Sequence, residues 1–371
     1  MERTILIQPR DPVIFRDGKP FTQGLPARST DWPLPSAVIG PIRTRMGRNT
    51  SYDDAAVKRL KLIEHVGPFM AACAGSGYTL AFPAPADVVA FAARDDAQGR
   101  PQLELCPLRP AKLLAGDGMD WPEDGLAPVL GGRGEKPTAA PPFWSAASTL
   151  GWLAEGGSTS VFRAVADVGF RAFSRQRRIH LEIETGTQAA KKGMLFSTEG
   201  LEFLERGICS RIRYRDDEVW AGLEALAPLG GERRLAYWSE PAINWPAPPD
   251  WLADEKLLRL QLITPGYFEK GWKPGWLQEG TPPGLDGLKL KLVAAAVPRA
   301  VAHSGWDLTK RGKNGQKATR FLAPAGSVYF CEVEAGDPRR LWMRSISDDF
   351  EDGQARRDGF GLVLCGRWQW R

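Results

Sequence analysis

The residues of this chain that could take part in chemistry are mostly basic, and its histidines and cysteines do not gather into a reactive set. The 371 residues include 49 Lys and Arg, 44 Asp and Glu, five Cys and three His. The sequence contains no CxxC pair, no HExxH, no GxSxG and no GxxxxGK[ST]. We therefore expect no metal site, no cofactor and no disulfide framework. The scattered cysteines are expected to be buried as small hydrophobic residues.

The positive charge is concentrated in two segments. The net charge is +5, yet residues 163–192 contain seven Lys or Arg against three acids, and residues 299–320 contain six against one. The two segments together carry +9, so the rest of the chain sums to −4. This distribution favours a polyanionic partner, and the alternative is two solvated loops.

The strongest candidate for a nucleic-acid contact is SRQRRIHLEIETGTQAAKKGMLF, Ser174 to Phe196. From Arg178 it alternates, with Ile179, Leu181 and Ile183 on one face and polar residues on the other, which predicts a half-buried strand. TGTQAAKKG would then be a long flexible connection to a second strand, giving an extended hairpin with basic residues at its base and tip. Such a hairpin can press against a nucleic-acid backbone. The alternative is an edge hairpin that its charges keep soluble.

Other basic residues accompany a helix end and tryptophans. The run IRTRMGR ends the first predicted helix, where the helix dipole also favours cations. Two segments, 271–277 and 304–321, combine Trp with basic residues, and Trp is both a base-stacking residue and an ordinary core residue. The residues that we predict to contact RNA are Arg43, Arg45, Arg175, Arg177, Arg178, His180, Lys191, Lys192, Lys273, Arg356, Arg357 and Arg367.

Two glycine clusters each precede a predicted strand, in LGGERRLAYW (Leu229 to Trp238) and DGFGLVLCGRW (Asp358 to Trp368). Glycine lets another backbone approach closely, and the amide groups of such a loop can face phosphate. Any turn from a helix to a strand also uses glycine, which is the alternative. The glycines concerned are Gly230, Gly231, Gly359, Gly361 and Gly366.

The helices and strands that position these residues fall into two groups. The segment between the groups, Ser239 to Glu255, contains four prolines and no helical or strand periodicity, which is typical of a linker. Before it we predict strands at 4–8, 78–82, 178–184 and 234–238, and helices at 33–47 and 216–229. After it we predict strands at 256–263, 288–297, 326–334 and 361–368, and a helix at 337–350. A helix between Ile263 and Leu288 has little support because that segment is rich in Gly and Pro.

Both halves approximate the order strand, helix, strand, strand, helix, strand. The predicted fold is α+β, with two ferredoxin-like (RRM-like) domains in tandem, a protruding β-hairpin and long loop insertions. The N-terminal domain is predicted over residues 1–240 with the hairpin near 174–196, the linker over 241–255 and the C-terminal domain over 256–371. No run of roughly 18 apolar residues and no export signal is present, so we expect a cytoplasmic protein.

Several blocks, in order, resemble the RAMP superfamily of CRISPR-associated proteins, and most closely the third subunit of the type III-B Cmr effector. They are RDPVIFRDGKPF, PLPSAVIGPIRT, FPAPAD, RIHLEIETGT, KKGMLF, PLGGERR, KGWKPGWL, SGWD, PAGSVYF and DGFGLVLCG. The resemblance implies a noncatalytic RNA-binding scaffold in antiviral defence that holds the 5′ tag of the CRISPR RNA. It also implies that the chain docks the large palm-domain subunit and the backbone RAMP subunits and meets target RNA only indirectly. From the lack of a long apolar run we expect no membrane partner.

The last glycine loop departs from the family pattern, which usually has five residues, often with Lys or Arg, between its second and last glycine. Here only the four apolar residues 362–365 intervene. The departure moves the expected phosphate contact to Arg356, Arg357 and Arg367. It also predicts a tight helix-to-strand turn whose glycines admit a neighbouring backbone.

Two other functions fit the same residues. The chain could be a metal-independent endoribonuclease that processes CRISPR repeat RNA with His180 as base, which requires a nearby acid and a positioned 2′-hydroxyl. It could also be a protein-only adaptor whose basic segments meet acidic subunits. Cleavage of repeat RNA without metal would favour the first, and an absence of RNA crosslinks in the assembled complex would favour the second.

Overall fold

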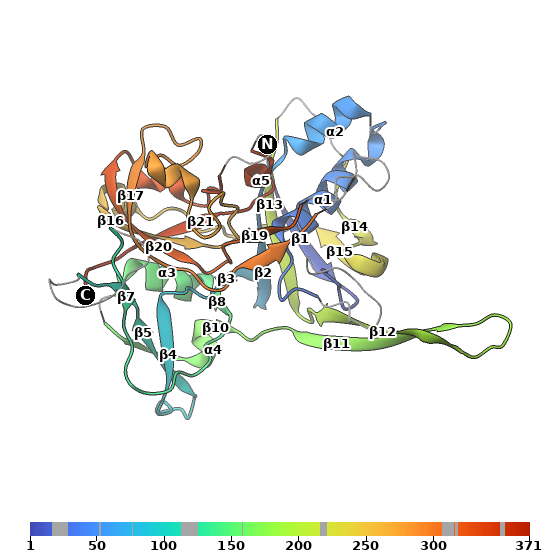
Figure 1. The fold of residues 1–371 in the computed structure, drawn as a ribbon, viewed down its shortest axis with the longest axis horizontal. Coiled ribbons are helices and arrows are strands. Elements are labelled where there is room, and N and C mark those ends of the chain that lie inside the picture. Colours follow the sequence, from blue (N-terminus) through green and yellow to red (C-terminus); the bar gives the residue numbers. More distant parts are fainter. Residues whose placement is uncertain are drawn as a thin grey trace. The chain divides into compact units, whose positions relative to one another are not determined.

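The computed structural model describes residues 1–371 apart from 17–28, 52, 76, 113–124, 158, 216–220, 306–314, 316–317 and 349–352. The chain forms two compact units that interleave along the sequence (Figure 1). Unit 1 consists of Met1–Cys73, Ala172–Ala242 and Val301–Leu322. Unit 2 consists of Ala74–Arg171, Ile243–Ala300 and Ala323–Arg371. The sequence prediction instead placed residues 1–240 and 256–371 in two consecutive domains.

Unit 1 is built on an antiparallel sheet with the strand order β2, β13, β1, β15, β14. Counted along the chain, β1, β2, β13 and β15 come in that order, so the sheet places the second, third, first and fourth of them side by side. The strands of unit 1 are β1 (Glu2–Pro9), β2 (Glu64–Ala74), β11 (Ser174–Ile183), β12 (Ala190–Glu202), β13 (Arg206–Arg213), β14 (Ala225–Pro228), β15 (Leu235–Ser239), β18 (Val301–His303) and β19 (Arg320–Leu322). Its helices are α1 (Pro35–Met46), α2 (Asp54–Lys61) and the 3₁₀ turns η1 (Gly47–Asn49) and η2 (Gly231–Arg233).

Local sequence explains both α-helices of unit 1. Helix α1 begins with Pro35 at its first turn, where the missing N–H costs nothing, and it buries a stripe that includes Val38, Ile42 and Met46. Helix α2 is capped by the Asp53 carboxylate, which accepts a hydrogen bond of 2.8 Å from the Ala56 N–H. Its last turn is basic, as the helix dipole favours.

Unit 2 contains a second antiparallel sheet with the order β17, β20, β16, β21. These are again the second, third, first and fourth strands along the chain. The remaining strands form a three-stranded sheet β4–β5–β9, the pair β6–β7 and the run β10–β8–β3. The strands are β3 (Gly77–Pro83), β4 (Val88–Ala93), β5 (Gln102–Pro107), β6 (Arg109–Pro110), β7 (Val129–Leu130), β8 (Phe143–Ser145), β9 (Val161–Ala164), β10 (Gly169–Phe170), β16 (Leu257–Leu262), β17 (Lys289–Ala296), β20 (Val328–Ala335) and β21 (Val363–Arg367).

The helices of unit 2 are short. They are α3 (Ala146–Ala154), α4 (Val165–Val168), α5 (Gln354–Arg357) and the 3₁₀ turns η3 (Asp250–Asp254), η4 (Gly275–Gln278) and η6 (Pro338–Leu341). Among the described residues, no helix is both long and apolar enough to cross a membrane. The molecule is thus α+β with mostly antiparallel sheets and few helices, which confirms the predicted class.

Two predicted helices are wrong. Within 216–229, residues 216–220 lie outside the described residues, and Ala225–Pro228 forms strand β14 because the exposed edge of β15 supplies backbone partners. Within 337–350, Asp337 caps a helix start as expected, but the helix ends after one 3₁₀ turn. The following backbone then bonds to the end of β21, with Met343 N–H donating to Val363 O at 2.9 Å. In both cases strand pairing overrides helix propensity.

The predicted strands near 4–8, 78–82, 234–238, 256–263, 288–297, 326–334 and 361–368 are all confirmed. Buried residues of β16, β17, β20 and β21 form the core of the second sheet. Four of the five cysteines are buried within the units, as predicted, and Cys73 is exposed. Burial raises the pKa of Cys331 to about 12, so this thiol is neutral and acts as a small hydrophobic residue.

Candidate nucleic-acid interface

The most distinctive part of unit 1 is the hairpin formed by β11 and β12, drawn in green in Figure 1. Its strands pair from Ser174 with Glu202 to Leu181 with Leu195, and the register shifts before Ile183 pairs with Ala190. The predicted hairpin is therefore confirmed. The predicted long connection is wrong, because β12 already begins at Ala190 and only residues 184–189 join the strands.

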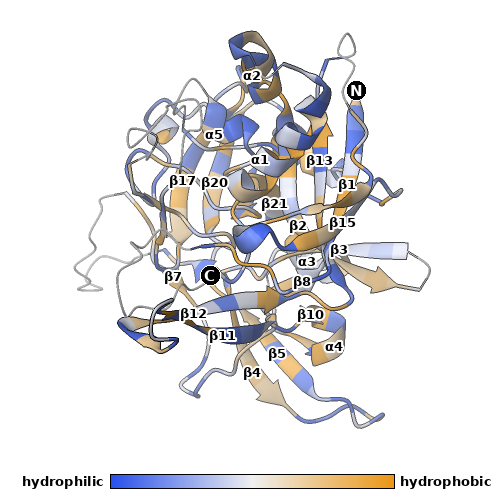
Figure 2. Ribbon diagram, turned by 90° about the vertical axis from the view of Figure 1, so that its right-hand side faces the viewer, coloured by the Kyte–Doolittle hydropathy of each residue, from blue (hydrophilic) through white to orange (hydrophobic). Residues whose placement is uncertain are grey.

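One face of the hairpin is apolar and exposed. Ile179 is 68% exposed, Leu181 51%, Ile183 56% and Leu195 60%. The sequence prediction of a half-buried strand is therefore wrong for this face, since nothing in the described chain covers it. Arg177 lies on the same face, two residues from Ile179, and its side chain makes no hydrogen bond or ion pair with any other described residue. Figure 2 shows the resulting mixture of hydrophilic and hydrophobic residues along both strands.

The opposite face carries Arg178 and His180. Arg178 is exposed, and its Nε donates to Gln176 at 2.7 Å. The His180 ring is half-buried, with Nε2 3.0 Å from the Thr198 hydroxyl, and it stacks on Phe196 with ring centroids 5.1 Å apart. These contacts hold the imidazole against the strand, and among the described residues no carboxylate contacts the ring.

Two lysines lie near the tip of the hairpin. Lys191 forms an ion pair of 2.8 Å with Glu182 across the strands. Lys192 is exposed and makes no hydrogen bond or ion pair with another described residue. The unpaired positive groups of the hairpin are therefore Arg177 and Lys192, with Arg178 held only by a neutral amide.

Arg175 fixes the root of the hairpin. It makes ion pairs with Asp31 and Glu199, and one guanidinium nitrogen donates to Ser29 O at 3.1 Å. Next to it, Phe173 packs against Phe203 with ring centroids 4.6 Å apart. Arg175 was predicted to contact RNA, but the structure gives its charge two carboxylate partners within the chain.

The two predicted arginines of helix α1 also face the protein. Arg43 donates to Ile63 O at 2.7 Å and so ties α1 to the segment that follows α2. Arg45 donates to Leu223 O at 3.2 Å and lies over the Trp238 ring. Burial lowers the pKa of Arg45, with a smaller contribution from the nearby Arg48. Both side chains are half-buried, and their hydrogen bonds are structural.

Gly230 and Gly361 occupy positions where φ is positive and a side chain would collide with neighbouring backbone. A Cβ on Gly230, which has φ +69°, would lie 2.8 Å from Ile14 O, and the Gly231 N–H donates to the same oxygen at 2.8 Å. A Cβ on Gly361, with φ +71°, would lie 2.9 Å from Ser347 N. The N–H groups of Gly359 and Gly361 donate to carbonyls of the chain. The turn from α5 to β21 therefore admits a neighbouring backbone, as expected, and these amides already have partners.

The predicted basic residues of unit 2 are half-buried. Arg367 donates to Glu255 at 2.9 Å and lies 4.3 Å over the Trp251 ring. Arg357 donates to Gln354 at 3.3 Å, while Arg356 and Lys273 also have interactions within the chain. Gly366 lies within β21, where a Cβ would meet Arg259 Nε at 2.8 Å. The predicted segment 304–321 lies mostly outside the described residues.

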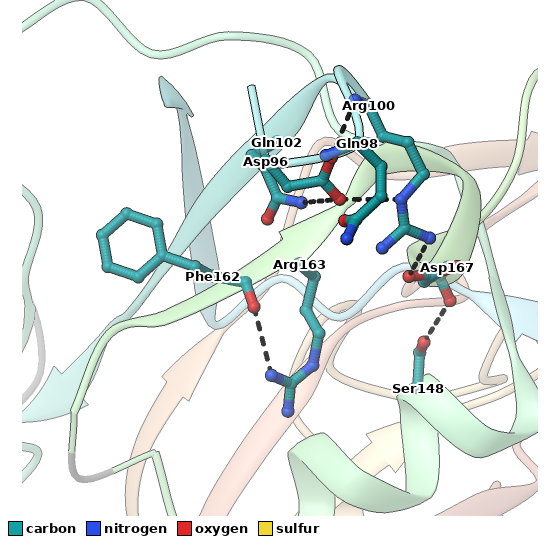
Figure 3. A network of polar contacts seen from close by, with 8 residues as sticks. All are labelled: Asp96, Gln98, Arg100, Gln102, Ser148, Phe162, Arg163 and Asp167. Carbon is teal, nitrogen blue, oxygen red and sulfur yellow. Dashed lines mark hydrogen bonds and ion pairs between the residues drawn. The ribbon is translucent and has the colours of Figure 1, made fainter. Parts of the chain in front are cut away.

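Basic residues before the hairpin are also paired with acids. Arg100 bridges Asp96 at 2.7 Å and Asp167 at 3.4 Å, as Figure 3 shows. Arg163 donates to Phe162 O at 3.1 Å and pairs with Glu155. Arg163 and Asp167 line a pocket of about 270 Å³ together with Trp144 and Trp152. Part of the positive charge counted in 163–192 is therefore internal to unit 2.

The structure brings together only part of the predicted site. Arg177, Arg178, His180, Lys191 and Lys192 share the hairpin, whereas Arg43, Arg45, Arg175 and Arg367 hold the fold. Sequence reasoning missed the exposure of the apolar face, because alternation shows that two faces differ and not which one is covered. Among the described residues, no group of three or more His, Cys, Asp or Glu could hold a metal ion.

Comparison with known proteins identifies the family. No curated protein sequence matches the chain. Two solved structures that match part of the chain are titled as the type III-B Cmr-beta bound to cognate target RNA, one of them with AMPPnP. They share 16% identity with this chain and cover 88% of it and 86% of their own chains, with TM-scores of 0.48 and 0.47. The model of the CRISPR-associated protein family Cas_Cmr3 matches residues 5–368, so this chain belongs to the Cas_Cmr3 family.

Proposed function

We propose that this protein is a noncatalytic RNA-binding subunit of a type III-B CRISPR effector ribonucleoprotein. It would hold the 5′ tag of the CRISPR RNA and bridge the large palm-domain subunit to the backbone subunits. The observation that carries the proposal is the hairpin of a Cas_Cmr3 family chain, on which Arg177, Arg178 and Lys192 are exposed without a carboxylate partner among the described residues.

The hairpin presents exposed groups that suit both parts of an RNA strand, its phosphates and its bases. Exposed guanidinium and ammonium groups neutralise phosphates and release counterions. Unstacked bases can pack against exposed aliphatic side chains such as Ile179 and Leu181, because this contact removes apolar surface from water. A surface of this kind would bind RNA largely without reading its sequence.

We also propose that each of the two main sheets is the core of a ferredoxin-like domain. The support is that β2–β13–β1–β15 and β17–β20–β16–β21 have the same order relative to the chain. Among the described residues, the connections between the strands of this sheet in unit 2 contain 3₁₀ turns and the four-residue α5, which would be a reduced helical layer.

Salt dependence of RNA binding tests the main proposal. If six phosphates are neutralised, the logarithm of affinity for a single-stranded CRISPR RNA should fall with the logarithm of salt with a slope of about −4. A variant with Arg177, Arg178 and Lys192 all changed to Gln should reduce that slope by about 2. The matched control changes the exposed Lys136, Lys256 and Lys289 to Gln, removing the same charge elsewhere. Equal slopes in both variants would reject the hairpin as the RNA site.

The absence of catalysis is tested separately. His180 contacts Thr198 and Phe196, and it lacks the recorded carboxylate partner that would orient a general base. We therefore expect repeat RNA to stay intact when incubated with the protein without metal. Site-specific cleavage that disappears in His180→Ala would instead make the chain an endoribonuclease.

The bridging role is tested in the assembled particle. RNA–protein crosslinks should map to β11 and β12, and protein–protein crosslinks should reach both the large subunit and a backbone subunit. A complex that assembles normally with no RNA adduct on this chain would indicate a protein-only adaptor.

A further inference from the structure

A pocket of about 270 Å³ in unit 2 is lined by residues of helix α3 and of strands β5 and β9. Trp144, Trp152 and Leu105 form apolar walls, and each of them is at most 3% exposed. Leu105 and Val161 are paired across β5 and β9, so their side chains lie on the same face of this sheet. The first three residues also belong to one hydrophobic core cluster. The pocket is therefore an opening into the core of this part of unit 2.

Gly151 of helix α3 keeps the pocket open. It lines the pocket, and a Cβ built on it would have nothing within 4 Å. Glycine inside a helix is less favourable than alanine, and an unfilled apolar cavity lowers stability. The chain thus keeps a space that a larger residue at this position would fill, and such a space suits an apolar ligand.

Strand β9 borders the pocket and has an open backbone edge. Among the described residues it pairs only with β5. At the end of this pairing the Val165 N–H donates to Pro101 O at 2.9 Å. By strand alternation, the backbone groups of Val161 and Arg163 also face β5, and those of Phe162 point away from it. The Phe162 C=O accepts the Arg163 guanidinium at 3.1 Å, whereas the Phe162 N–H has no acceptor among the described residues.

A strand added at this edge would place a side chain at the pocket. The side chains of β9 alternate, with Val161 and Arg163 lining the pocket. Phe162 is 58% exposed, and its side chain points away from that of Arg163 (Figure 3). A strand paired with β9 has the same alternation, so every second side chain of it would face the pocket. The volume is below the roughly 300–1,000 Å³ of a site for a drug-sized ligand, so it suits one side chain.

The charged groups at the pocket are already paired with one another. Glu155 pairs with Arg163 at 3.1 Å, and Asp167 pairs with Arg100 at 3.4 Å. Among the described lining residues, Arg163 is the one cation, while Glu155 and Asp167 are acids. A phosphate would have to displace a carboxylate to reach a guanidinium group and would meet a second carboxylate beside it. The pocket therefore favours an uncharged apolar group over the backbone of a nucleic acid.

We propose that β9 and this pocket bind an extended segment of a partner subunit. The segment adds a strand to β9 and inserts one uncharged apolar side chain into the pocket. That a partner subunit exists rests on the function proposed above. The contact is separate from the hairpin and needs no RNA.

The variant Gly151→Leu tests the pocket half of the proposal. Its side chain should fill the space and weaken binding of the full chain to the partner about 10- to 100-fold, the effect of no longer burying one apolar side chain. Gly40→Leu is the matched control, because Gly40 also lies inside a helix with nothing within 4 Å of its Cβ position. Calorimetric titrations with the purified large subunit and with a backbone subunit measure the affinities, and thermal unfolding shows whether each variant is folded. Equal affinities of the two variants for every subunit that binds the parent chain would overturn the proposal.

Hydrogen exchange of the parent chain tests the strand pairing without any substitution. The amides of residues 160–164 should exchange more slowly when the partner subunit is bound, and the Phe162 amide most of all. Unchanged exchange there with every subunit that binds would reject the added strand. If CRISPR RNA alone slows these amides, the occupant is RNA and the proposal is wrong.

The same titrations separate this proposal from the function on which it rests. If the parent chain binds a subunit but neither the Gly151 substitution nor exchange at β9 reports the contact, only the docking site fails. If the parent chain binds neither subunit, the bridging function fails and the docking site fails with it.

Discussion

Arg259 of β16 and Asp87, which precedes β4, form an ion pair of 2.5 Å in which both side chains are only 1% exposed. The other Asp87 oxygen accepts the Trp152 indole N–H at 3.0 Å, and Arg259 also donates to Trp152 O. The pair thus joins the β4–β5–β9 region, helix α3 and the β17–β20–β16–β21 sheet of unit 2.

Asp87→Ala should be strongly destabilising, because it leaves the Arg259 charge and the Trp152 N–H buried without their acceptor. Removing one partner of a buried pair costs about 3–5 kcal/mol. The free energy of unfolding from urea titration measures the loss. Asp87→Ala combined with Arg259→Met should recover part of it, since no buried charge is left unpaired. A single variant as stable as the parent chain would show that water or another group satisfies Arg259.

Gly361→Ala should destabilise the chain by about 1–3 kcal/mol, because the residue has φ +71° and a Cβ would collide with Ser347. Gly40→Ala is the control. It lies inside α1 with nothing within 4 Å of its Cβ position, so it should stabilise the chain by about 0.5–1 kcal/mol. Thermal unfolding of the two variants should therefore shift in opposite directions, and shifts of the same sign would contradict this account.

Glu240 should make stability depend on pH. Burial raises its pKa, but hydrogen bonds from Arg3 outweigh burial and the net pKa is lowered from 4.5. A carboxylate with a lowered pKa stabilises the fold above its unfolded pKa, and this contribution is lost as the pH falls through the folded value. The stability difference between the parent chain and Glu240→Gln should be largest at neutral pH and should shrink below about pH 4.5. A difference that does not vary with pH would mean that the neutral amide of the variant keeps the same bonds to Arg3.

Arg175→Ala should loosen the root of the hairpin more than it changes global stability. Its partly exposed ion pairs contribute about 0.2–1 kcal/mol each, but they all lie at the point where the hairpin joins the sheet. Hydrogen exchange should accelerate in residues 174–183 and stay unchanged in β13. Arg178→Ala serves as control, because its one recorded partner is Gln176 on the same strand. Equal hydrogen exchange in both variants would show that aromatic packing around Phe173 is enough to hold the root of the hairpin without the Arg175 ion pairs.

The sequence predicted most of the strands and the hairpin, because alternation and β-branched residues are local signals. It failed at 216–229 and 337–350, where helix-like composition is overridden by pairing with β15 and β21. It also could not tell that Arg43, Arg45 and Arg175 have internal partners, since those partners are backbone carbonyls or acids from distant segments. Arg177 and Lys192 have no such partners among the described residues, and they remain predicted RNA contacts.

The guanidinium of Arg43 is bonded to the backbone at Ile63, and it illustrates how formal charge and usable charge diverge in this molecule. The formal net charge counts every arginine equally, but a polyanion competes only for those whose donors still face water. Substituting such an inward-facing arginine would therefore mimic a binding defect by weakening the fold. Stability has to be measured beside affinity before any basic residue is assigned to an interface.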